Sequence, residues 1–582
     1  MTSILRDIRS LRPTGVAHDL AAALAVTFMA VPQGIAYALI AGLPPIMGLY
    51  AATLPTIVGS LFRSSRHVVA GPTNAVSLVV GGAVGAASAK LGLPPEVIAV
   101  QLALLVGLMQ VGAGVLRLGS IVDFISKPVV LGYITGAGVL IGVGQLPALT
   151  GSPGGSGDLF DKLFTWGSHL NEAQMLPVAV GLSVAAGIVL LRRVDRRLPG
   201  ALLALSTATV ASVLLELPAQ GLTSLGMLSS VPSGLPPLSL PGLPAWELLS
   251  LAAAATVLSL VESSAVARSL ADKTGDTVDA NLEFLGQGLA NLAASVVSGY
   301  PVSGSLARSR LNLEAGAQSR LAGVFSGLLV VGVLLVAGPL VEQIPIAALA
   351  GLLLVVAWDL VDRSRIVMAL NGSLGDKLAL VITTLGTWVL PLDKAIYAGI
   401  AISIALFVRR ASLLVIRELR VDDHGRLAER DLSAGSSCER VSILHVEGAL
   451  FFGAAAELRA ALDEVVRRPA VQVVVLRMKR TQGLDMTCTE VLASTARSLR
   501  AQGKTLILVG MREDTLASLR RTGAADVLGE ENLFPTRARW FEAMTHALDR
   551  AHGLSDDHAT SCELTAWLRA RLAAKPQKPL DT

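Results

Sequence analysis

Apolar runs of about 20 residues recur along the first 410 residues of the chain, and the texture becomes mixed and charged from about residue 411. About 20 residues is the length that an α-helix needs to cross the hydrocarbon core of a bilayer. Beyond residue 411, short β-branched runs alternate with helical patterns. The pattern therefore predicts a large helical membrane domain, 18–410, followed by a small soluble α/β domain.

The membrane domain divides into two halves of seven apolar segments each, about 18–216 and 246–410. The first half holds segments near 18–39, 45–62, 70–87, 95–117, 124–147, 174–192 and 199–216. The second holds segments near 246–270, 280–298, 301–314, 319–339, 344–361, 377–391 and 393–409. An odd number of spans in each half predicts two repeats that are inverted relative to each other.

Lys and Arg are distributed unequally between the connections. When the N-terminal segment 1–17 is placed in the cytosol, the even-numbered connections carry most of the positive charge, including the cluster at 192–197. The odd-numbered connections, and the long segment 217–245, hold little or none. Because positive residues mark the cytosolic side of membrane proteins, this bias predicts a multi-pass protein of the cell (inner) membrane with a cytosolic soluble domain.

Two apolar stretches are interrupted by Gly, Pro and small polar residues at matching places. One reads AGPTNAVSLVV around Pro72, and the other reads SGYPVSGSLARSR around Pro301. Each follows an apolar segment with a polar residue near its middle, Gln33 and Glu262. Gln33 and Glu262 are 229 residues apart, as are Pro72 and Pro301. Interrupted helices at corresponding places of two inverted repeats predict a transporter's substrate site.

In such a pair, two helix N-termini face each other near the middle of the membrane, where their unpaired N–H groups attract anions. A helix end contributes only roughly 0.3–2 kcal/mol to a nearby anion, less than the removal of water costs. We therefore expect Arg308 to supply further charge, although its side chain would also be long enough to reach the cytosolic surface. Small polar residues are expected to cap the helices and to donate hydrogen bonds to the ligand, namely Thr73, Asn74, Ser303 and Ser305.

Glu262 lies well inside an apolar helix, ATVLSLVESSAVA. A charge at that depth costs roughly 2.5–3.5 kcal/mol on insertion scales, so such a residue normally faces a cavity, a partner or a proton path. Burial disfavours the charged form of a carboxyl group, which makes Glu262 the candidate for binding a coupling proton. A static ion pair or a hydrogen bond between helices is the alternative. Gln33 would line the same cavity or bond to a neighbouring helix.

Composition gives no sign of an enzyme, a cofactor or a metal site. The net charge of +4 follows the membrane topology and does not indicate nucleic acid. Cys438, Cys488 and Cys562 have no metal-ligand spacing, and His552 and His558 fit a solvated loop. No nucleophile–base constellation or phosphate loop stands out.

The segment DLAAALAVTFMAVPQGIAYALIAGLPPIMGLYAATLP, followed by SSRHVVAGPTNAVSL, closely resembles the SulP anion transporters, also called solute carrier family 26. PVSGSLARSRLN and VESSAVARSLA are similar to the tenth and eighth helices of that family, and the resemblance covers roughly residues 10–552. It implies fourteen helices in two inverted repeats of seven, a core of helices 1–4 and 8–11, and a gate of helices 5–7 and 12–14. It also implies an elevator-like movement of core against gate, and a homodimer.

The resemblance assigns roles to residues of the interrupted helices. It implies that the anion is lined by Gln33, Thr73, Asn74, Ser303, Gly304 and Ser305. Glu262 matches an acidic position linked to proton or sodium coupling, and Arg308 matches a basic position implicated in anion binding.

The soluble part resembles a STAS domain at 438–552, preceded by a linker at 411–437 and followed by a tail at 553–582. In related bacterial antagonists a phosphorylated hydroxyl follows an Asp at a helix start, and Thr487 occupies the matching place. Thr487 is thus a candidate phosphorylation site or a helix cap, in a domain that offers a surface to a cytosolic partner.

These features predict secondary active transport of a small anion (a sulfate-type inorganic anion, bicarbonate or a dicarboxylate), coupled to protons. The alternatives are a sodium-coupled symporter, an anion exchanger or channel, and a membrane-anchored sensor that acts through its STAS domain.

Overall fold

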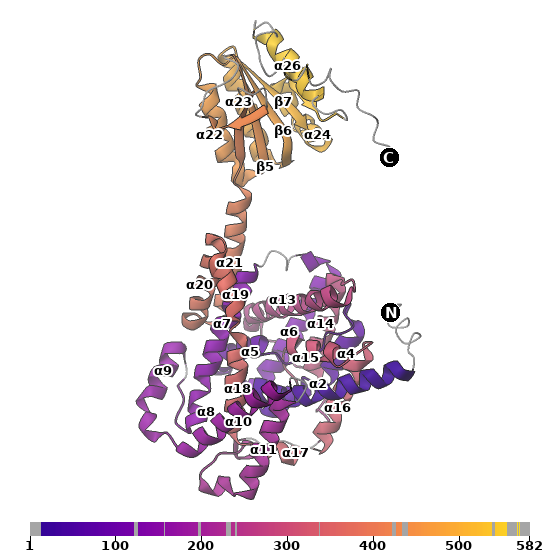
Figure 1. Ribbon diagram of the computed structural model, residues 1–582, viewed down its shortest axis with the longest axis vertical. Coiled ribbons are helices and arrows are strands. Elements are labelled where there is room, and N and C mark those ends of the chain that lie inside the picture. The colour runs from indigo at the N-terminus through magenta and orange to yellow at the C-terminus, as the bar shows by residue number, and fades with distance from the viewer. Residues whose placement is uncertain are drawn as a thin grey trace. The chain divides into compact units, whose positions relative to one another are not determined.

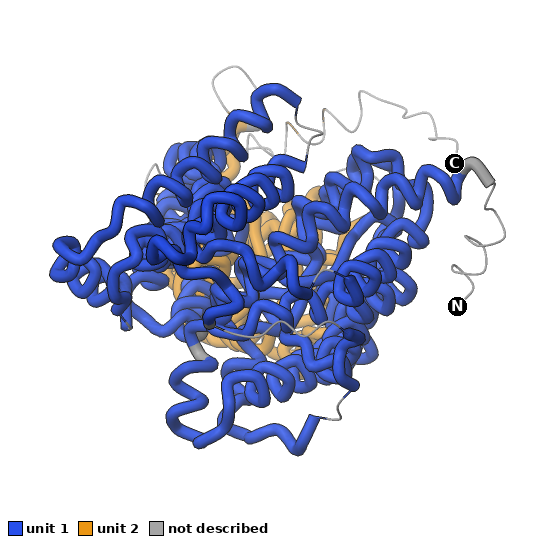
Figure 2. Tube along the Cα trace, turned by 90° about the horizontal axis from the view of Figure 1, so that it is seen from below, with its two compact units in different colours: residues 1–404 blue, residues 405–582 orange. Residues whose placement is uncertain are grey.

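The computed structural model describes residues 13–120, 126–155, 157–195, 199–228, 234–238, 241–336, 338–421, 427–432, 440–537 and 542–555, with 567 and 570. The chain divides into two compact units, 1–404 and 405–582 (Figure 2). Several positions considered above lie outside the described residues: most of the N-terminal segment and of the tail, parts of the linker, Cys438, Cys562 and His558.

Unit 1 is helical, and each predicted span contains a described helix (Figure 1). The first half comprises α2 (Pro13–Ile40), α3 (Pro45–Tyr50) with α4 (Leu54–Phe62), α5 (Asn74–Leu91), α6 (Pro95–Val115), α7 (Lys127–Gly144), α10 (Met175–Val194) and α11 (Gly200–Leu214). The second half comprises α13 (Leu249–Thr274), α14 (Ala280–Val296), α15 (Leu306–Glu314), α16 (Leu321–Val336), α18 (Ile346–Leu360), α20 (Leu374–Val389) and α21 (Leu392–Ala411). Shorter helices in the connections are α8 (Leu146–Thr150), α9 (Leu159–Ser168), α12 (Leu225–Leu228), α17 (Gly338–Glu342) and α19 (Arg363–Asn371).

Seven helical stretches of the described chain are long and apolar enough to cross a membrane alone. They are Gly15–Ile40, Pro45–Phe62, Asn74–Leu91, Pro95–Val115, Lys127–Thr150, Met175–Val194 and Trp246–Thr274. The other predicted spans hold shorter helices, except α21 with 20 residues, and α15 is short because an extended segment precedes it. Irregular backbone of this kind is tolerated at membrane depth only where protein or a watery cavity surrounds it.

The helix contacts repeat between the two halves. The contact between α6 and α14 corresponds to the contact between α16 and α4. The contact between α2 and α16 corresponds to the contact between α13 and α6. The contacts of α15 with α2 and of α7 with α20 likewise have counterparts in those of α5 with α13 and of α18 with α10. In each of these counterparts, every helix is replaced by the equivalent helix of the other half. The densest contacts join α2–α6 with α13–α16, and separately α7 and α10 with α18 and α20, which are the predicted core and gate.

Close glycine contacts pull helices together in both groups. A Cβ added to Gly48 would lie 1.9 Å from the carbonyl oxygen of Gly34, and one added to Gly351 would lie 2.1 Å from that of Gly181. The first pair brings α3 against α2, and the second brings α18 against α10. Small residues at such contacts let helix backbones approach closely, which compensates for the missing hydrophobic drive inside a bilayer.

Unit 2 contains a six-stranded sheet in the order β4-β3-β5-β6-β7-β8. The strands are β3 (Val415–Val421), β4 (Leu427–Arg430), β5 (Val441–Leu450), β6 (Val473–Leu484), β7 (Thr505–Met511) and β8 (Leu533–Pro535). β5 to β8 run parallel, and β3 pairs antiparallel with β4 and β5. α22 (Ala455–Val466), α23 (Met486–Ala501), α24 (Glu513–Arg521) and α25 (Ala524–Leu528) cover one face, and α26 (Glu542–Leu554) packs on the other. The α/β prediction for the soluble part is confirmed.

Candidate functional site

The two interrupted segments meet as a short antiparallel pair of strands. β1 (Ala70–Gly71) pairs with β2 (Ser303–Gly304), so that Ala70 lies opposite Gly304 and Gly71 opposite Ser303. α5 begins three residues after β1, and α15 begins two residues after β2. Two helices from different repeats therefore begin next to one strand pair. The N-terminus of each helix has backbone N–H groups without helical partners.

Thr73 and Ser305 occupy the N-cap positions of these helices, but only Ser305 caps with its side chain. The Ser305 hydroxyl accepts a hydrogen bond from the Arg308 N–H at 3.4 Å. The Thr73 hydroxyl makes no cap and instead donates to Oε2 of Glu262 in α13 at 2.9 Å. Ser303 lies against the same carboxyl group. Glu262 thus joins the two interrupted helices, and its side chain is only half-buried.

Arg308 lies on the first turn of α15 and is fully buried. Its Nη2 donates to the carbonyl oxygen of Pro72, in the other repeat, at 2.6 Å. Nη1 and Nε have no hydrogen-bond partner among the described residues. Arg308 and Glu262 are close enough to interact electrostatically. The alternative in which Arg308 reaches the cytosolic surface is wrong, because its guanidinium group is held at the strand pair.

Further hydrogen bonds tie the two interrupted segments together. The Val69 N–H donates to Oγ of Ser309 at 2.9 Å, and Nδ2 of Asn312 donates to the His67 carbonyl at 3.1 Å. The hydroxyls of Ser77 in α5 and Tyr300 lie 2.9 Å apart. The two interrupted segments therefore form one hydrogen-bonded unit that spans both repeats.

Gln33, Asn74 and Gly304, the other residues of the predicted site, differ in the polar groups that they offer to a ligand. Gln33 is half-buried, and its Oε1 has no hydrogen-bond partner within the described part of the chain. Asn74 is also half-buried, and its Oδ1 accepts from the Ala75 N–H at 2.8 Å. Gly304 contributes backbone alone, because a Cβ there would lie 2.8 Å from the hydroxyl of Ser263.

The site predicted from the sequence did not include a buried stripe of polar residues on α14. Its members lie four residues apart and face inward: Glu283, Gln287 and Asn291. Gln287 accepts a hydrogen bond from Nη2 of Arg63 at 2.9 Å, and Nη1 of Arg63 lies 3.8 Å from Oε2 of Glu283. Arg63 is itself buried. The signal for this stripe was present as a polar residue at every fourth position of a predicted span.

In unit 2, Thr487 is exposed on the first turn of α23. Asp485 is the N-cap of that helix, and its side chain accepts from the Cys488 N–H at 2.9 Å and from the Phe452 N–H at 2.6 Å. The helix cap is therefore Asp485 rather than Thr487.

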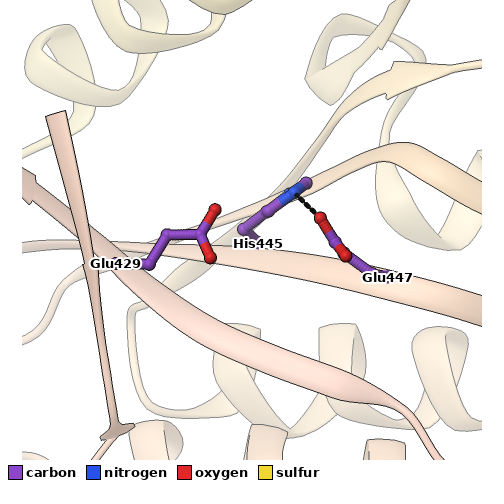
Figure 3. A group of neighbouring side chains, drawn as sticks. All are labelled: Glu429, His445 and Glu447. Atoms are coloured by element: carbon purple, nitrogen blue, oxygen red, sulfur yellow. Dashed lines mark hydrogen bonds and ion pairs between the residues drawn. The ribbon is translucent and has the colours of Figure 1, made fainter.

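A second polar cluster in unit 2 comprises Glu429, His445 and Glu447, whose ligand-type atoms all lie within 4.8 Å of one another (Figure 3). Nε2 of His445 lies 3.0 Å from Oε1 of Glu447. Two guanidinium groups already lie in the cluster: Arg480 pairs with Glu447, and Arg477, whose Nη1 lies 3.2 Å from Nδ1 of His445, interacts electrostatically with Glu429 and Glu447. Burial and Arg477 lower the pKa of His445, and the Arg480 hydrogen bond lowers that of Glu447. A metal ion would have to displace these cations, so the cluster fits a charge-balanced network better than a metal centre.

The helical repeats, the paired half-helices and the buried charge between them define a multi-pass membrane transport protein with an appended α/β domain. Residues 16–383 match the Sulfate permease family, and residues 437–539 match the STAS domain. The chain belongs to this family, which is also called SulP or SLC26, and it is an anion transporter rather than an enzyme.

Individual relatives agree with this assignment. The chain is 30% identical over 525 residues to the "Putative sulfate transporter YvdB" of Bacillus subtilis, covering 89% of this chain and 95% of the relative. A solved structure of SLC26A9 superposes with a TM-score of 0.86 at 20% identity and covers 95% of this chain and 93% of that one. The transmembrane domain of a cyanobacterium bicarbonate transporter, BicA, superposes with a TM-score of 0.58 at 22% identity, covering 68% and 97%. The predicted fold of fourteen helices in inverted repeats with a STAS domain is confirmed.

Proposed function

We propose that this protein is a secondary active transporter that carries a small anion between the N-termini of α5 and α15. The observation that carries the proposal is the fully buried Arg308, whose Nη1 and Nε have no partner in the described chain beside two helix N-termini. A buried donor without a partner costs about 1–3 kcal/mol, and more when it is charged. A bound anion would satisfy these donors and would meet the positive ends of both helices.

The anion class follows from the donors. Backbone N–H groups of two helix N-termini and one guanidinium group suit a compact oxyanion with several acceptor oxygens. The candidates are a sulfate-type inorganic anion, bicarbonate and a small dicarboxylate. The names of the relatives, sulfate transporter and bicarbonate transporter, support the first two.

An elevator-like movement fits the placement of these residues. Gln33, Thr73, Glu262 and Arg308 lie on α2, α13 and the two interrupted helices, all of them in the core group. Movement of the core against the gate would carry the whole anion site without breaking its internal hydrogen bonds.

Proton coupling is assigned to Glu262. Its carboxyl group is half-buried, bonds to Thr73 of one interrupted helix and lies against Ser303 of the other. Protonation removes a negative charge beside the anion and Arg308. Binding of the proton and binding of the anion would therefore favour each other.

The test is uptake into liposomes that contain purified protein. Labelled sulfate and bicarbonate are supplied with and without an inward proton gradient, and the wild type is compared with Glu262→Gln and with Glu216→Gln, an exposed control. Gradient-driven uptake that is lost only in Glu262→Gln supports the proposal. Uptake that follows sodium, or that ignores both gradient and Glu262, would favour a sodium symporter, an exchanger or a channel. A wild type that transports neither of these anions nor a dicarboxylate would favour the STAS sensor.

The proposal also includes the orientation in the membrane, the oligomeric state and a cytosolic partner. We place the protein in the cell (inner) membrane with its N-terminus and the STAS domain at 438–552 in the cytosol, as the distribution of Lys and Arg indicates. We also propose that the protein forms a homodimer. A cytosolic partner would recognise the phosphorylated form of Thr487, which is exposed.

A further inference from the structure

The Val302 peptide group, directly before β2, is held by a side chain of another helix. Asn291 of α14 is fully buried, and its Oδ1 accepts a hydrogen bond from the Val302 N–H at 2.7 Å. Its Nδ2 donates to the Val302 carbonyl at 3.1 Å. The carboxamide therefore pairs with both polar groups of one residue, as a neighbouring antiparallel strand would. The Val302 N–H can only donate, which fixes the orientation of the Asn291 amide.

The Val302 carbonyl is held from two further directions. Nε2 of Gln287 donates to it at 2.8 Å, and the hydroxyl of Ser259 in α13 donates at 3.0 Å. Asn291 is braced in turn, because its Nδ2 also lies 2.8 Å from Oε1 of Gln110 in α6. A carbonyl oxygen has two lone pairs, so three donors saturate it and leave this peptide group little freedom to rotate.

The corresponding helix of the first repeat acts in a similar way. There, the hydroxyl of Thr56 in α4 donates to the carbonyl of Ala70 in β1 at 2.9 Å. α4 and α14 belong to the second span of their repeats, and β1 and β2 open the third. In each repeat, a polar side chain of the second span therefore fixes the extended segment of the third.

We propose that Asn291 is a positioning residue of the anion site, an inference that rests on the proposed function. Val302 directly precedes Ser303, which pairs with Gly71 and lies against Glu262. Asn291 touches none of the ligand-facing groups itself. By fixing the Val302 peptide group, it sets where Ser303 and the first N–H groups of α15 stand relative to Arg308. Loose placement of these donors weakens anion binding more than it slows the movement of the core.

The test compares Asn291→Ala with Ser295→Ala in reconstituted full-length protein. Ser295 is buried one turn further along α14, and its hydroxyl bonds to the Leu292 carbonyl of its own helix. Labelled sulfate, bicarbonate and chloride serve as probes. For each anion that the wild type transports, Asn291→Ala is expected to raise KM roughly tenfold, with a smaller change in maximal rate per folded protein. Ser295→Ala is expected to keep the wild-type KM. A folded Asn291→Ala with wild-type KM would overturn the proposal.

Two additions keep the test decisive. If Asn291→Ala does not fold, Ser259→Ala removes one of the three donors to Val302 and is expected to raise KM roughly two- to threefold; an unchanged KM would count against the proposal. Amide hydrogen exchange of peptides covering 300–305 reports on the segment without transport. Exchange at Val302 is expected to quicken at least roughly tenfold in Asn291→Ala, which removes the acceptor of the Val302 N–H, and not in Ser295→Ala. A wild type that moves neither these probes nor a small dicarboxylate would refute the proposed function, while unchanged exchange in Asn291→Ala would refute the role of Asn291.

Discussion

Arg308 of the second repeat reaches across the strand pair and donates a hydrogen bond to the carbonyl oxygen of Pro72 in the first repeat at 2.6 Å. Its guanidinium group can take this path because Gly71 has no side chain. A Cβ on Gly71 would lie 2.8 Å from Nη1, 3.0 Å from Nη2 and 3.1 Å from Cζ of Arg308. One glycine therefore determines where the principal positive charge of the proposed anion site is held.

Gly71→Ala is expected to displace Arg308 and weaken anion binding. The φ of Gly71 is +149°, a backbone conformation that residues with a Cβ rarely adopt, so the substitution also strains the backbone by about 1–3 kcal/mol. We expect KM for the transported anion to rise at least roughly tenfold. Gly85→Ala in α5 is the control, because a Cβ there meets nothing within 4 Å. Gly71→Ala with wild-type KM would mean that Arg308 does not contact the anion.

The shape of the Arg308 side chain is expected to matter as well as its charge. Lys keeps the charge but has no planar fork that donates to Pro72 and to an anion at once. The expected order of KM is therefore lowest for the wild type, higher for Arg308→Lys and highest for Arg308→Gln, measured as concentration-dependent uptake. Arg310→Gln, two residues further along α15, controls for the loss of a charge from this helix. Equal KM values for Arg308→Lys and the wild type would show that charge alone suffices.

The sequence was sufficient for the spans and for the interrupted helices, and the reason is physical. Bilayer thickness imposes a length on every apolar run, and a half-helix at membrane depth requires the small and polar residues seen around Pro72 and Pro301. Thr73, Ser303 and Arg308 could be named as residues of the proposed site because they lie in those interruptions.

Contacts across long sequence separations could not be predicted. Whether Arg308 turns inward or toward the membrane surface depends on Gly71 and on a carbonyl 236 residues away. The α14 stripe carries a visible signal, but its partner Arg63 directly follows the predicted span 45–62, and nothing in the sequence near it points to α14. The cluster around His445 joins residues of β4, β5 and β6 in a sheet where β3 lies between β4 and β5, and the sequence does not reveal this order.

Cys488 is expected to resist alkylation in the folded protein. Burial, together with the nearby Asp485 carboxylate, raises the pKa of its thiol to about 12, and its Sγ donates to the Phe451 carbonyl at 3.3 Å. Because the thiolate is the reactive form, labelling at pH 8 should be at least about a hundredfold slower than in denaturant. Mass spectrometry of the peptide that contains Cys488 measures this. Met486→Cys, at a position 80% exposed, should label quickly; rapid labelling of Cys488 itself would contradict its burial.

His445 is expected to make the stability of unit 2 depend on pH below about 6.5, the ordinary pKa of histidine. Burial lowers its pKa first, and Arg477 lowers it further, while Glu429 and Glu447 act in the opposite direction. The unfolded chain therefore binds a proton at a pH where folded His445 stays neutral. The contribution to the free energy of unfolding is fully present above pH 6.5 and is lost as the pH falls through the folded pKa. Hydrogen exchange of peptides from 440–555, measured in the full chain between pH 5 and pH 8, follows this loss. His445→Gln should flatten the dependence in this window, whereas His546→Gln, at an exposed position of α26, should leave it unchanged. A wild type and a His445→Gln variant with equal pH dependence would show that another group, such as the Glu447 carboxylate paired with Arg480, governs the acid stability of the domain.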